Sequence, residues 1–333
     1  MYSYFIVRIR PRVNGNSSGL DKRLESVHAP SHPAKWNSAC PFSPAAAILH
    51  ETRLAGRIFP IERFHLAHEL LTARLDRKDC ISEVAQCYHF EFVLDRLESF
   101  PFLPGQFVSA VAEDANGKLQ TRAYSLASAP NKNRFELCVN RVEEGFFSNH
   151  LADLPDLPIG ATIDIHGPHG HFVLRQPLTD SILIATGTGI APMRGFLRWL
   201  FPDNAQDRSA GKDIWLVYGT RHESDIYYRD EFEALAARNA NFHYLPTLSR
   251  AEDSWRGLRG YVQDHVARIL AERAERLGQP LPTPAPDPAT PPAALNFDIH
   301  AYVCGLNDMV AAVRERLAAF GWHRKQIVFE RYD

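Results

Sequence analysis

The spacing of hydrophobic and polar residues along this chain changes near residue 72 and again near residue 181. Between these two points, short alternating or apolar runs are separated by turn signals such as Pro104-Gly105 and Asn116-Gly117. The runs cover residues 88–94, 106–111, 120–126, 134–142, 162–166 and 171–174. Short strands at this spacing predict a small antiparallel β-barrel.

Beyond residue 181, apolar strand-like runs alternate with segments of helical periodicity. Strands are predicted at residues 181–185, 214–218, 242–248, 300–304 and 326–330. Helices are predicted at residues 192–200, 228–238, 261–276 and 307–320. This alternation is typical of an α/β unit with a parallel sheet.

The predicted fold therefore has two domains. An antiparallel β-barrel spans residues 74–178, and an α/β domain with a parallel sheet spans residues 179–333. A chain of 333 residues is long enough for each domain to bury a core of its own. Residues 279–294 are rich in proline and are expected to form an extended loop or linker inserted in the second domain.

Residues 1–73 form an N-terminal extension that we expect to be largely disordered. Residues 13–46 are rich in Ser, Asn, Pro and Ala, a composition that cannot build a core. Residues 61–71 have the pattern of one short amphipathic helix. A transit segment and a start codon placed too early are two alternatives for this stretch, whereas a secretory signal would need a clean apolar core and a small-residue cleavage site.

Composition and charge exclude several classes of function. No apolar run approaches the roughly 20 residues of a membrane helix, so we predict no membrane span. A net charge of -2 gives no field that would favour nucleic acid. Residues 1–78 hold 12 Lys and Arg against 6 Asp and Glu. This basic end is either a docking surface for an acidic partner or a solvated extension.

The cysteines indicate a reducing compartment. Their number, five, is odd and their spacing is irregular, which argues against a disulfide framework and favours a cytoplasmic protein. The sequence contains no paired-cysteine cluster, so we predict neither an iron–sulfur cluster nor a zinc site within the chain.

The first chemical motif is the run Arg-Ala-Tyr-Ser-Leu-Ala-Ser at residues 122–128. In a strand, Arg122 and Tyr124 share one face and Ser125 points the other way. A flavin needs a cation for its phosphates, a flat surface for its ring and a hydrogen-bonding group near its N5 atom. Arg122, Tyr124 and Ser125 supply these three in turn.

Two downstream segments fit the same ligand. Cys138, Val139 and Asn140 end a predicted strand, and a turn at Gly145, Phe147 and Ser148 opens a predicted helix over residues 148–154. Glycine permits the tight turn, and a serine with the backbone N–H groups of a helix start makes an anion site. We interpret this turn as a pyrophosphate site.

The second chemical motif is Gly-Thr-Gly-Ile-Ala-Pro at residues 187–192. An apolar strand leads into it and a predicted helix leaves it, which is the arrangement of a phosphate cradle. Gly187, Gly189, Ile190 and Pro192 would form the cradle, Gly189 by letting the backbone approach the dinucleotide. Thr188 would reach the nicotinamide or the flavin.

Three further strands end in residues suited to a nucleotide. They end at Gly219 and Arg221, at Ser249 and Arg250, and at Cys304 and Gly305. Ligands in such sheets lie at the carboxyl ends of the strands. A guanidinium and a hydroxyl together suit a phosphate monoester.

From about residue 74 to its end the chain resembles the ferredoxin–NADP reductase superfamily. The motifs occur in family order: the Arg-x-Tyr-Ser strand, the Gly-x-x-Ser turn, the Gly-Thr-Gly-Ile-Ala-Pro turn, the Cys-Gly strand end and the Glu-x-Tyr terminus. The resemblance implies FAD and NADP(H) as cofactors, with NADH as an alternative to NADPH. It also implies an enzyme.

The resemblance implies a role for each flavin residue. Arg122 and Ser148 would bind the FAD pyrophosphate, Tyr124 would stack on the isoalloxazine, and Ser125 would hydrogen-bond its N5 edge. Residues 138–140 would line the FAD through their backbone.

The resemblance also implies roles at the other face of the flavin. Tyr332 would stack there and move aside for the nicotinamide, and Glu330 would aid proton movement near N5. Cys304 would lie by the nicotinamide C4. Ser249 and Arg250 would hold the 2′-phosphate of NADP, with Arg221 assisting.

Two positions depart from the plant-type pattern. Asn140 stands where plant-type members have a lysine that contacts the NADP phosphates, and Asn140 cannot supply that charge. Asp333 extends the chain beyond Tyr332, where plant-type members end.

The expected activity is hydride transfer between NADP(H) and FAD, with Ser125, Glu330 and Cys304 as the catalytic residues, and one-electron exchange with ferredoxin or flavodoxin. One alternative is a reductase that serves an oxygenase, a cytochrome or another complex. The other is a subunit that binds flavin or nucleotide without turnover.

Overall fold

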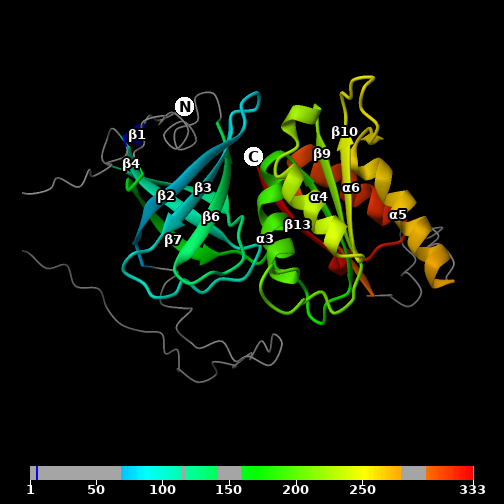
Figure 1. Ribbon diagram of the computed structural model, residues 1–333, viewed down its shortest axis with the longest axis horizontal. Helices are drawn as coiled ribbons and strands as arrows, with labels where there is room; N and C mark the ends of the chain where they lie inside the picture. The colour runs from blue at the N-terminus through cyan, green and yellow to red at the C-terminus, as the bar shows by residue number, and fades with distance from the viewer. Residues whose placement is uncertain (1–4, 7–68, 115–117, 142–158, 279–297, 333) are drawn as a thin grey trace, which may run out of the picture. The chain divides into compact units, whose positions relative to one another are not determined.

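The structure is a computed structural model that describes residues 5–6, 69–114, 118–141, 159–278 and 298–332. Two sheets account for all of the strands in these ranges, and both belong to one compact unit of the chain (Figure 1).

The first sheet is antiparallel, with strand order β1-β4-β7-β2-β3-β6 and with β5 paired to β4. Its strands are β1 (Phe5–Ile6), β2 (Leu71–Ser82), β3 (Cys87–Val93), β4 (Phe107–Asp114), β5 (Leu119–Ser125), β6 (Arg134–Asn140) and β7 (Thr162–His169). A bridge between Leu126 and Leu137 brings the end of β5 to β6, so the strands β2–β7 close into a barrel.

The barrel core follows from alternation along its strands. In β7, buried and partly buried residues alternate, as expected for a strand with one face toward a core. The interior is filled by aromatic rings that stack across strands, such as Phe92 and Phe135, whose centroids are 5.3 Å apart.

The second sheet is parallel, with order β11-β10-β9-β8-β12-β13. Its strands are β8 (Asp180–Thr186), β9 (Ile214–Thr220), β10 (Phe242–Leu248), β11 (Leu258–Arg259), β12 (Ile299–Leu306) and β13 (Ile327–Tyr332). The central strands β8, β9 and β12 are buried over nearly their whole length. Burial on both faces explains why they appear in the sequence as continuous apolar runs.

Helices cover both faces of this sheet. One face packs on α3 (Ile190–Leu200) and α4 (Arg229–Arg238), and the other on α5 (Val262–Leu277) and α6 (Asn307–Ala319). Helix α5 ends at Gly278, whose φ of 61° is the left-handed conformation of a helix C-cap. Of the helices in the described ranges, none is both long and apolar enough to cross a bilayer.

Most of the predicted elements are confirmed, and two segments are corrected. Residues 171–174 were expected to be a strand, but they leave the sheet because Phe172 packs on Phe196 of α3, with centroids 5.5 Å apart. Leu71, expected at the end of a helix, is the first residue of β2. Strands β1, β2 and β11 were not predicted, and β1 and the start of β2 fall within the extension expected to be largely disordered. Residues 61–68, the helix predicted at 148–154 and the insert at 279–294 lie outside the described residues.

Helix α3 lies between the barrel and the parallel sheet (Figure 1). Its apolar side chains share a single core cluster with the sheet and with barrel residues Cys87, Ala127, Cys138 and Phe172. The two sheets are therefore joined by continuous hydrophobic packing rather than by a linker alone.

A buried arginine adds polar bonds to this contact. The side chain of Arg194 in α3 is 6% exposed. Its guanidinium donates to the Ala127 carbonyl (2.7 Å) and to the Glu136 carboxylate of the barrel, and to Glu231 of α4 (2.8 Å). A buried guanidinium is tolerated where carboxylates and carbonyls replace its water.

The same cluster continues through a histidine and a tyrosine. His89 of β3 bonds through Nδ1 to the Tyr228 hydroxyl (2.9 Å), and the guanidinium carbon of Arg194 lies 4.6 Å from the centre of the Tyr228 ring. Tyr228 has a left-handed backbone with φ 56°, an unfavourable conformation for a side chain of this size. Its contacts across the domain boundary hold it there.

His89 makes stability depend on pH. Burial, and secondly the charge of Arg194, lower the pKa of His89 from 6.5 to about 4. Between these values the unfolded chain binds more protons, so the free energy of unfolding falls as pH drops. Urea unfolding measures the free energy of unfolding at pH 7 and at pH 5. We expect it to fall by about 2 kcal/mol less in His89→Asn than in the wild type over this interval.

Other groups do not obscure this comparison. Arg194 lowers the pKa of Glu136 below the usual range of a glutamate, so its effect falls below the pH range tested. His265 and His300 also have lowered pKa values, and they remain in both proteins. Equal losses in the wild type and His89→Asn would refute the assignment to His89.

Candidate active site

The predicted flavin strand is β5, which pairs with β4 along its whole length. Tyr124 packs on Ala110 and Ala112 of β4, which fixes the ring against the sheet. Arg122 is exposed and its guanidinium donates to the Thr121 carbonyl (2.9 Å). The strand thus presents a fixed aromatic ring and an accessible cation, and their roles toward a flavin stay predictions.

Ser125, at the end of β5, meets the last strand of the chain. Its hydroxyl donates to the Glu330 carboxylate at 3.2 Å and lies 2.9 Å from the Tyr332 hydroxyl. Since serine has one hydroxyl proton, Tyr332 is the donor when Ser125 donates to Glu330. Ser125 and two predicted site residues of β13, which are 205 and 207 positions away, therefore form one hydrogen-bonded chain.

Cys304 joins this group through the register of the sheet. β12 pairs with β13 so that Cys304 lies opposite Glu330. Burial raises the pKa of Glu330, although the hydrogen bond from Ser125 partly offsets it. Burial likewise raises the pKa values of the Cys304 thiol and the Tyr332 phenol. The cluster thus favours neutral forms and can keep a proton near Ser125.

Glu330 also faces a cavity of about 410 Å³. The barrel residues Phe107, His171 and Arg175 and the β13 residue Phe329 line it with Glu330. The carboxyl therefore lies between Ser125 and a space that water can enter, which suits a group that exchanges protons.

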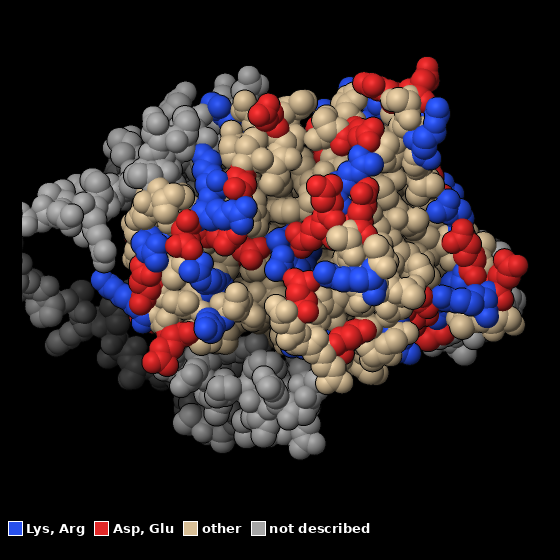
Figure 2. All heavy atoms as spheres, in the orientation of Figure 1, with Lys and Arg blue, Asp and Glu red and all other residues tan. Residues whose placement is uncertain are grey.

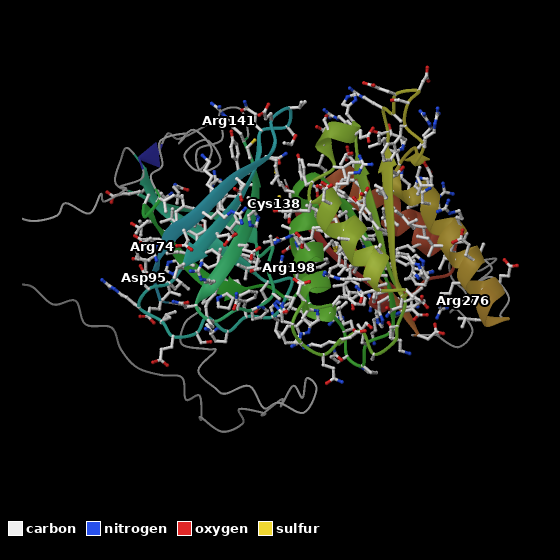
Figure 3. All side chains as sticks on the ribbon, viewed as in Figure 1. Arg74, Asp95, Cys138, Arg141, Arg198 and Arg276 are labelled. Atoms are coloured by element: carbon white, nitrogen blue, oxygen red, sulfur yellow. The ribbon has the colours of Figure 1, made fainter. Side chains whose placement is uncertain are left out.

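The second flavin segment is only partly described. Cys138 and Val139 of β6 are buried, and the side-chain oxygen of Asn140 is buried with no hydrogen-bond partner among the described residues. Figure 3 shows Cys138 on β6, toward α3 and α4. Gly145, Phe147 and Ser148 lie outside the described residues.

The glycine turn joins β8 to α3 and forms the short helix η1 (Gly187–Gly189). A side chain at Gly187 would meet nothing within 4 Å, and the Gly187 carbonyl accepts from the Tyr218 hydroxyl (3.1 Å). At Gly189, a Cβ would lie 2.1 Å from the Cys304 carbonyl oxygen. The Gly189 backbone thus closely approaches strand β12, whereas Gly187 faces open space, and the predicted approach of Gly189 to a dinucleotide stays a prediction.

The other residues of the turn divide in the same way. Thr188 is partly exposed, whereas Ile190 and Pro192 are buried in the first turn of α3 and anchor it. Thr186, just before the turn, has a buried hydroxyl with no partner among the described residues, and a Cβ on Gly305 would lie 2.5 Å from it. Sequence analysis missed Thr186 because only its place in the fold isolates the hydroxyl.

Ser249 and Arg250 directly follow β10 and lie beside the end of β9. Their backbone N–H groups donate to the carbonyls of Thr220 and Arg221 (3.0 Å each), and both side chains are exposed. Gly219 is buried, and a Cβ there would lie 2.6 Å from the Val262 side chain, so its role is packing.

Tyr261 was not predicted at this edge. Its side chain is 64% exposed, and it follows β11, which pairs with the end of β10 so that Leu248 is opposite Arg259. An exposed ring just beyond the carboxyl end of β11 is suited to a nucleotide base. The available signal was an aromatic residue that directly follows Arg-Gly after the Ser249-Arg250 turn.

These features fit both cofactors on structural grounds. The unpartnered Asn140 and Thr186 oxygens offer hydrogen bonds to a ligand, and Gly187 leaves room beside the turn. The Tyr124 ring, the Arg122 cation and the Ser125 hydroxyl are arranged along one strand end.

Comparison with known proteins agrees with this geometry. Residues 72–174 match the family model of an oxidoreductase FAD-binding domain, and residues 183–315 match that of an oxidoreductase NAD-binding domain. Ferredoxin–NADP reductase B from Sorangium cellulosum (strain So ce56) is 40% identical over 240 residues, which cover 71% of this chain and 87% of that protein. The chain belongs to the ferredoxin–NADP reductase superfamily.

Other relatives are more distant or longer. The reductase component of a phenol 2-monooxygenase from Pseudomonas sp. (strain CF600) is 35% identical over 175 residues, 51% of this chain and 46% of that one. A ferredoxin NADP+ reductase from Neisseria gonorrhoeae, solved with FAD and NADP, has a TM-score of 0.60 at 22% identity and shares the fold over 79% of this chain and 98% of its own.

Family membership establishes the class of the protein. This reductase is an oxidoreductase, and its cofactors are FAD and a nicotinamide dinucleotide. The alternative of a subunit without turnover is not supported. The individual site residues remain predictions that the geometry makes testable.

The two glycines of the turn provide the first test. Gly189→Ala would push a methyl group into the Cys304 carbonyl, so we expect a loss of about 3 kcal/mol in the free energy of unfolding. Gly187→Ala should cost about 1 kcal/mol because of its positive φ, while its methyl group projects into open space and weakens dinucleotide binding. Urea unfolding and nucleotide titration measure the two effects, and equal stability losses would contradict this division.

The serine provides the second test. Ser125→Ala removes the hydroxyl that links Tyr332 to Glu330, so we expect flavin reduction at saturating nucleotide to slow by about 100-fold while FAD stays bound. Stopped-flow absorbance measures the rate. Ser209→Ala is a suitable control because Ser209 is also buried but its hydroxyl donates to Asp207, away from β5 and β13. Unchanged reduction in Ser125→Ala would remove Ser125 from the mechanism.

Proposed function

We propose that this protein transfers hydride between NADP(H) and FAD and exchanges single electrons with a ferredoxin or flavodoxin. The observation that carries the proposal is the hydrogen-bonded group of Ser125, Glu330 and Tyr332, with Cys304 opposite Glu330. It joins the end of the flavin strand to β13 and, through the pairing of β13 with β12, to the strand that packs on the glycine turn. A nicotinamide and a flavin would meet there.

Bound FAD would supply the redox chemistry, which is the exchange of a hydride with a nicotinamide and of single electrons with the carrier. The protein supplies position and proton control. Tyr124 and Arg122 would bind the flavin. Ser125 would hold its hydroxyl at the N5 edge, and Glu330 would deliver or remove the proton through Ser125 from the adjoining cavity.

Ser249 and Arg250 support NADPH as the preferred donor. Their exposed side chains offer a hydroxyl and a guanidinium at the carboxyl edge of the sheet, beside Arg221. The exposed Tyr261 follows β11 at the same edge. Arg259 does not compete for the phosphate, because its guanidinium donates to the carbonyls of Ala251, Glu252 and Trp255. It orders the loop that carries Arg250.

A second candidate function is that of a reductase component for an oxygenase. The similarity to the phenol 2-monooxygenase reductase component favours it, and there the donor would be NADH. The two candidates differ in carrier and donor, while they share the flavin site. Figure 2 shows positive and negative side chains intermixed over the visible face. The charge of that face therefore favours neither type of electron carrier.

We place the reductase in the cytoplasm as part of the same proposal. The described cysteines Cys80, Cys87, Cys138 and Cys304 are free thiols, which suits a reducing compartment.

The deciding experiment is cytochrome c reduction by the purified flavoprotein, with NADPH or NADH and with or without added ferredoxin. We expect a rate that depends on ferredoxin and is higher with NADPH. Reduction of the flavin with no response to ferredoxin would favour the oxygenase-type alternative. Failure of both nucleotides to reduce the flavin would overturn the proposed function.

A further inference from the structure

Helix α3 makes its contact with the barrel directly beside the flavin strand. A Cβ on Gly195 would lie 3.0 Å from the Leu126 carbonyl oxygen and 3.1 Å from that of Ser128. These carbonyls belong to the segment that continues from Ser125. The helix is therefore in backbone contact with the chain one to three residues beyond the proposed N5 contact.

The buried side chain of the neighbouring Arg194 adds hydrogen bonds to this contact. It donates to the Ala127 carbonyl, which lies between the two carbonyls that touch Gly195, and to Glu136 of β6. Ala127 and Glu136 are themselves joined by a backbone hydrogen bond (2.8 Å). The guanidinium thus binds both the segment that follows β5 and the strand β6.

The other end of α3 is the nucleotide turn. Arg194 lies five residues after Gly189, the last residue of η1, which corresponds to about 7.5 Å along a helix. Helix α3 is continuous over this span and is buried on nearly every residue. Its placement on the barrel therefore determines where the nucleotide turn lies relative to Ser125.

We propose that Arg194 is a positioning residue for hydride transfer, which sets the distance between the flavin at Ser125 and the nicotinamide at the Gly187–Gly189 turn by fixing α3 on residues 126–128 and Glu136. The inference rests on the proposed function and assigns a role to a residue that touches neither cofactor nor substrate. Transfer between two rings depends steeply on their separation, and a displacement of about 1 Å can cost about 100-fold in rate.

The test compares Arg194→Met, Arg194→Lys and Glu136→Gln with Arg198→Gln. Arg198 lies one turn further along the same helix, is 40% exposed and contacts Glu231 at 3.4 Å, so its loss leaves the barrel contact intact. For FAD-loaded, folded protein we expect Arg194→Met to reduce flavin at saturating NADPH about 10- to 100-fold more slowly, with little change in the nucleotide Kd. Arg194→Lys should restore part of the rate, and Arg198→Gln should match the wild type.

Cysteine labelling reports on the contact between α3 and the barrel without any need for turnover. Cys87 is fully buried in the core shared by the barrel and α3, whereas Cys80 is exposed. We expect iodoacetamide, followed by peptide mass spectrometry, to label Cys80 in all proteins and Cys87 faster in Arg194→Met, while the buried Cys304 stays protected. Faster labelling of Cys304 as well would reveal general unfolding of Arg194→Met. Glu136→Gln would then replace it in the comparison with the wild type.

The outcomes separate the inference from the function on which it rests. Wild-type reduction rates in Arg194→Met and Glu136→Gln, or an effect on Kd alone, would overturn the positioning role. Unchanged Cys87 labelling would overturn the claim that Arg194 fixes α3. If wild-type protein is not reduced by either nucleotide, the proposed function fails, and the positioning role with it, even where Cys87 labelling still shows that Arg194 holds the domains together.

Discussion

A positive charge buried between two domains is the constraint that governs the rest of this structure. The Arg194 guanidinium has lost its water and is compensated by Glu136 from the barrel and by Glu231 from α4. Separating the domains would take Glu136 and the Ala127 carbonyl away from the guanidinium, which would keep only Glu231 of its own domain. Losing one partner of a buried ion pair is costly. The pair of domains therefore behaves as one body at this contact, and the arginine specifies its geometry more than it adds to its stability.

The apolar contacts around this charge require small residues at defined positions. A Cβ on Gly105 would lie 1.9 Å from the Phe172 carbonyl oxygen, and one on Gly195 would meet the carbonyls beyond β5. Close packing of this kind transmits a displacement instead of absorbing it. The position of the glycine turn relative to the flavin strand is consequently a property of the whole contact, and only indirectly of the motif residues.

Burial away from water shifts the pKa values of the acidic and the basic groups in opposite directions. Burial raises the pKa of Glu330 and lowers that of His89, and in both cases the neutral form is favoured. At the domain contact a neutral histidine avoids adding a second positive charge beside Arg194. At the candidate active site a carboxyl that retains its proton more readily is a suitable donor through Ser125.

The elements and the chemistry of the two motifs could be predicted from the sequence alone. Hydrophobic periodicity predicted the barrel and the parallel sheet, because strands buried on one face alternate and strands buried on both do not. The runs at residues 122–125 and 187–192 predicted the ligands, because their residue types and spacing match what a flavin and a dinucleotide require. These are local properties, and a sequence displays them directly.

How these parts meet became visible only in the folded chain. Folding places Ser125 against Glu330 and Tyr332, brings Gly189 against β12 and isolates the Thr186 hydroxyl. It also gives Arg194 partners 58 and 67 positions away in the chain. Such contacts depend on packing between distant segments, which no local pattern of residues encodes.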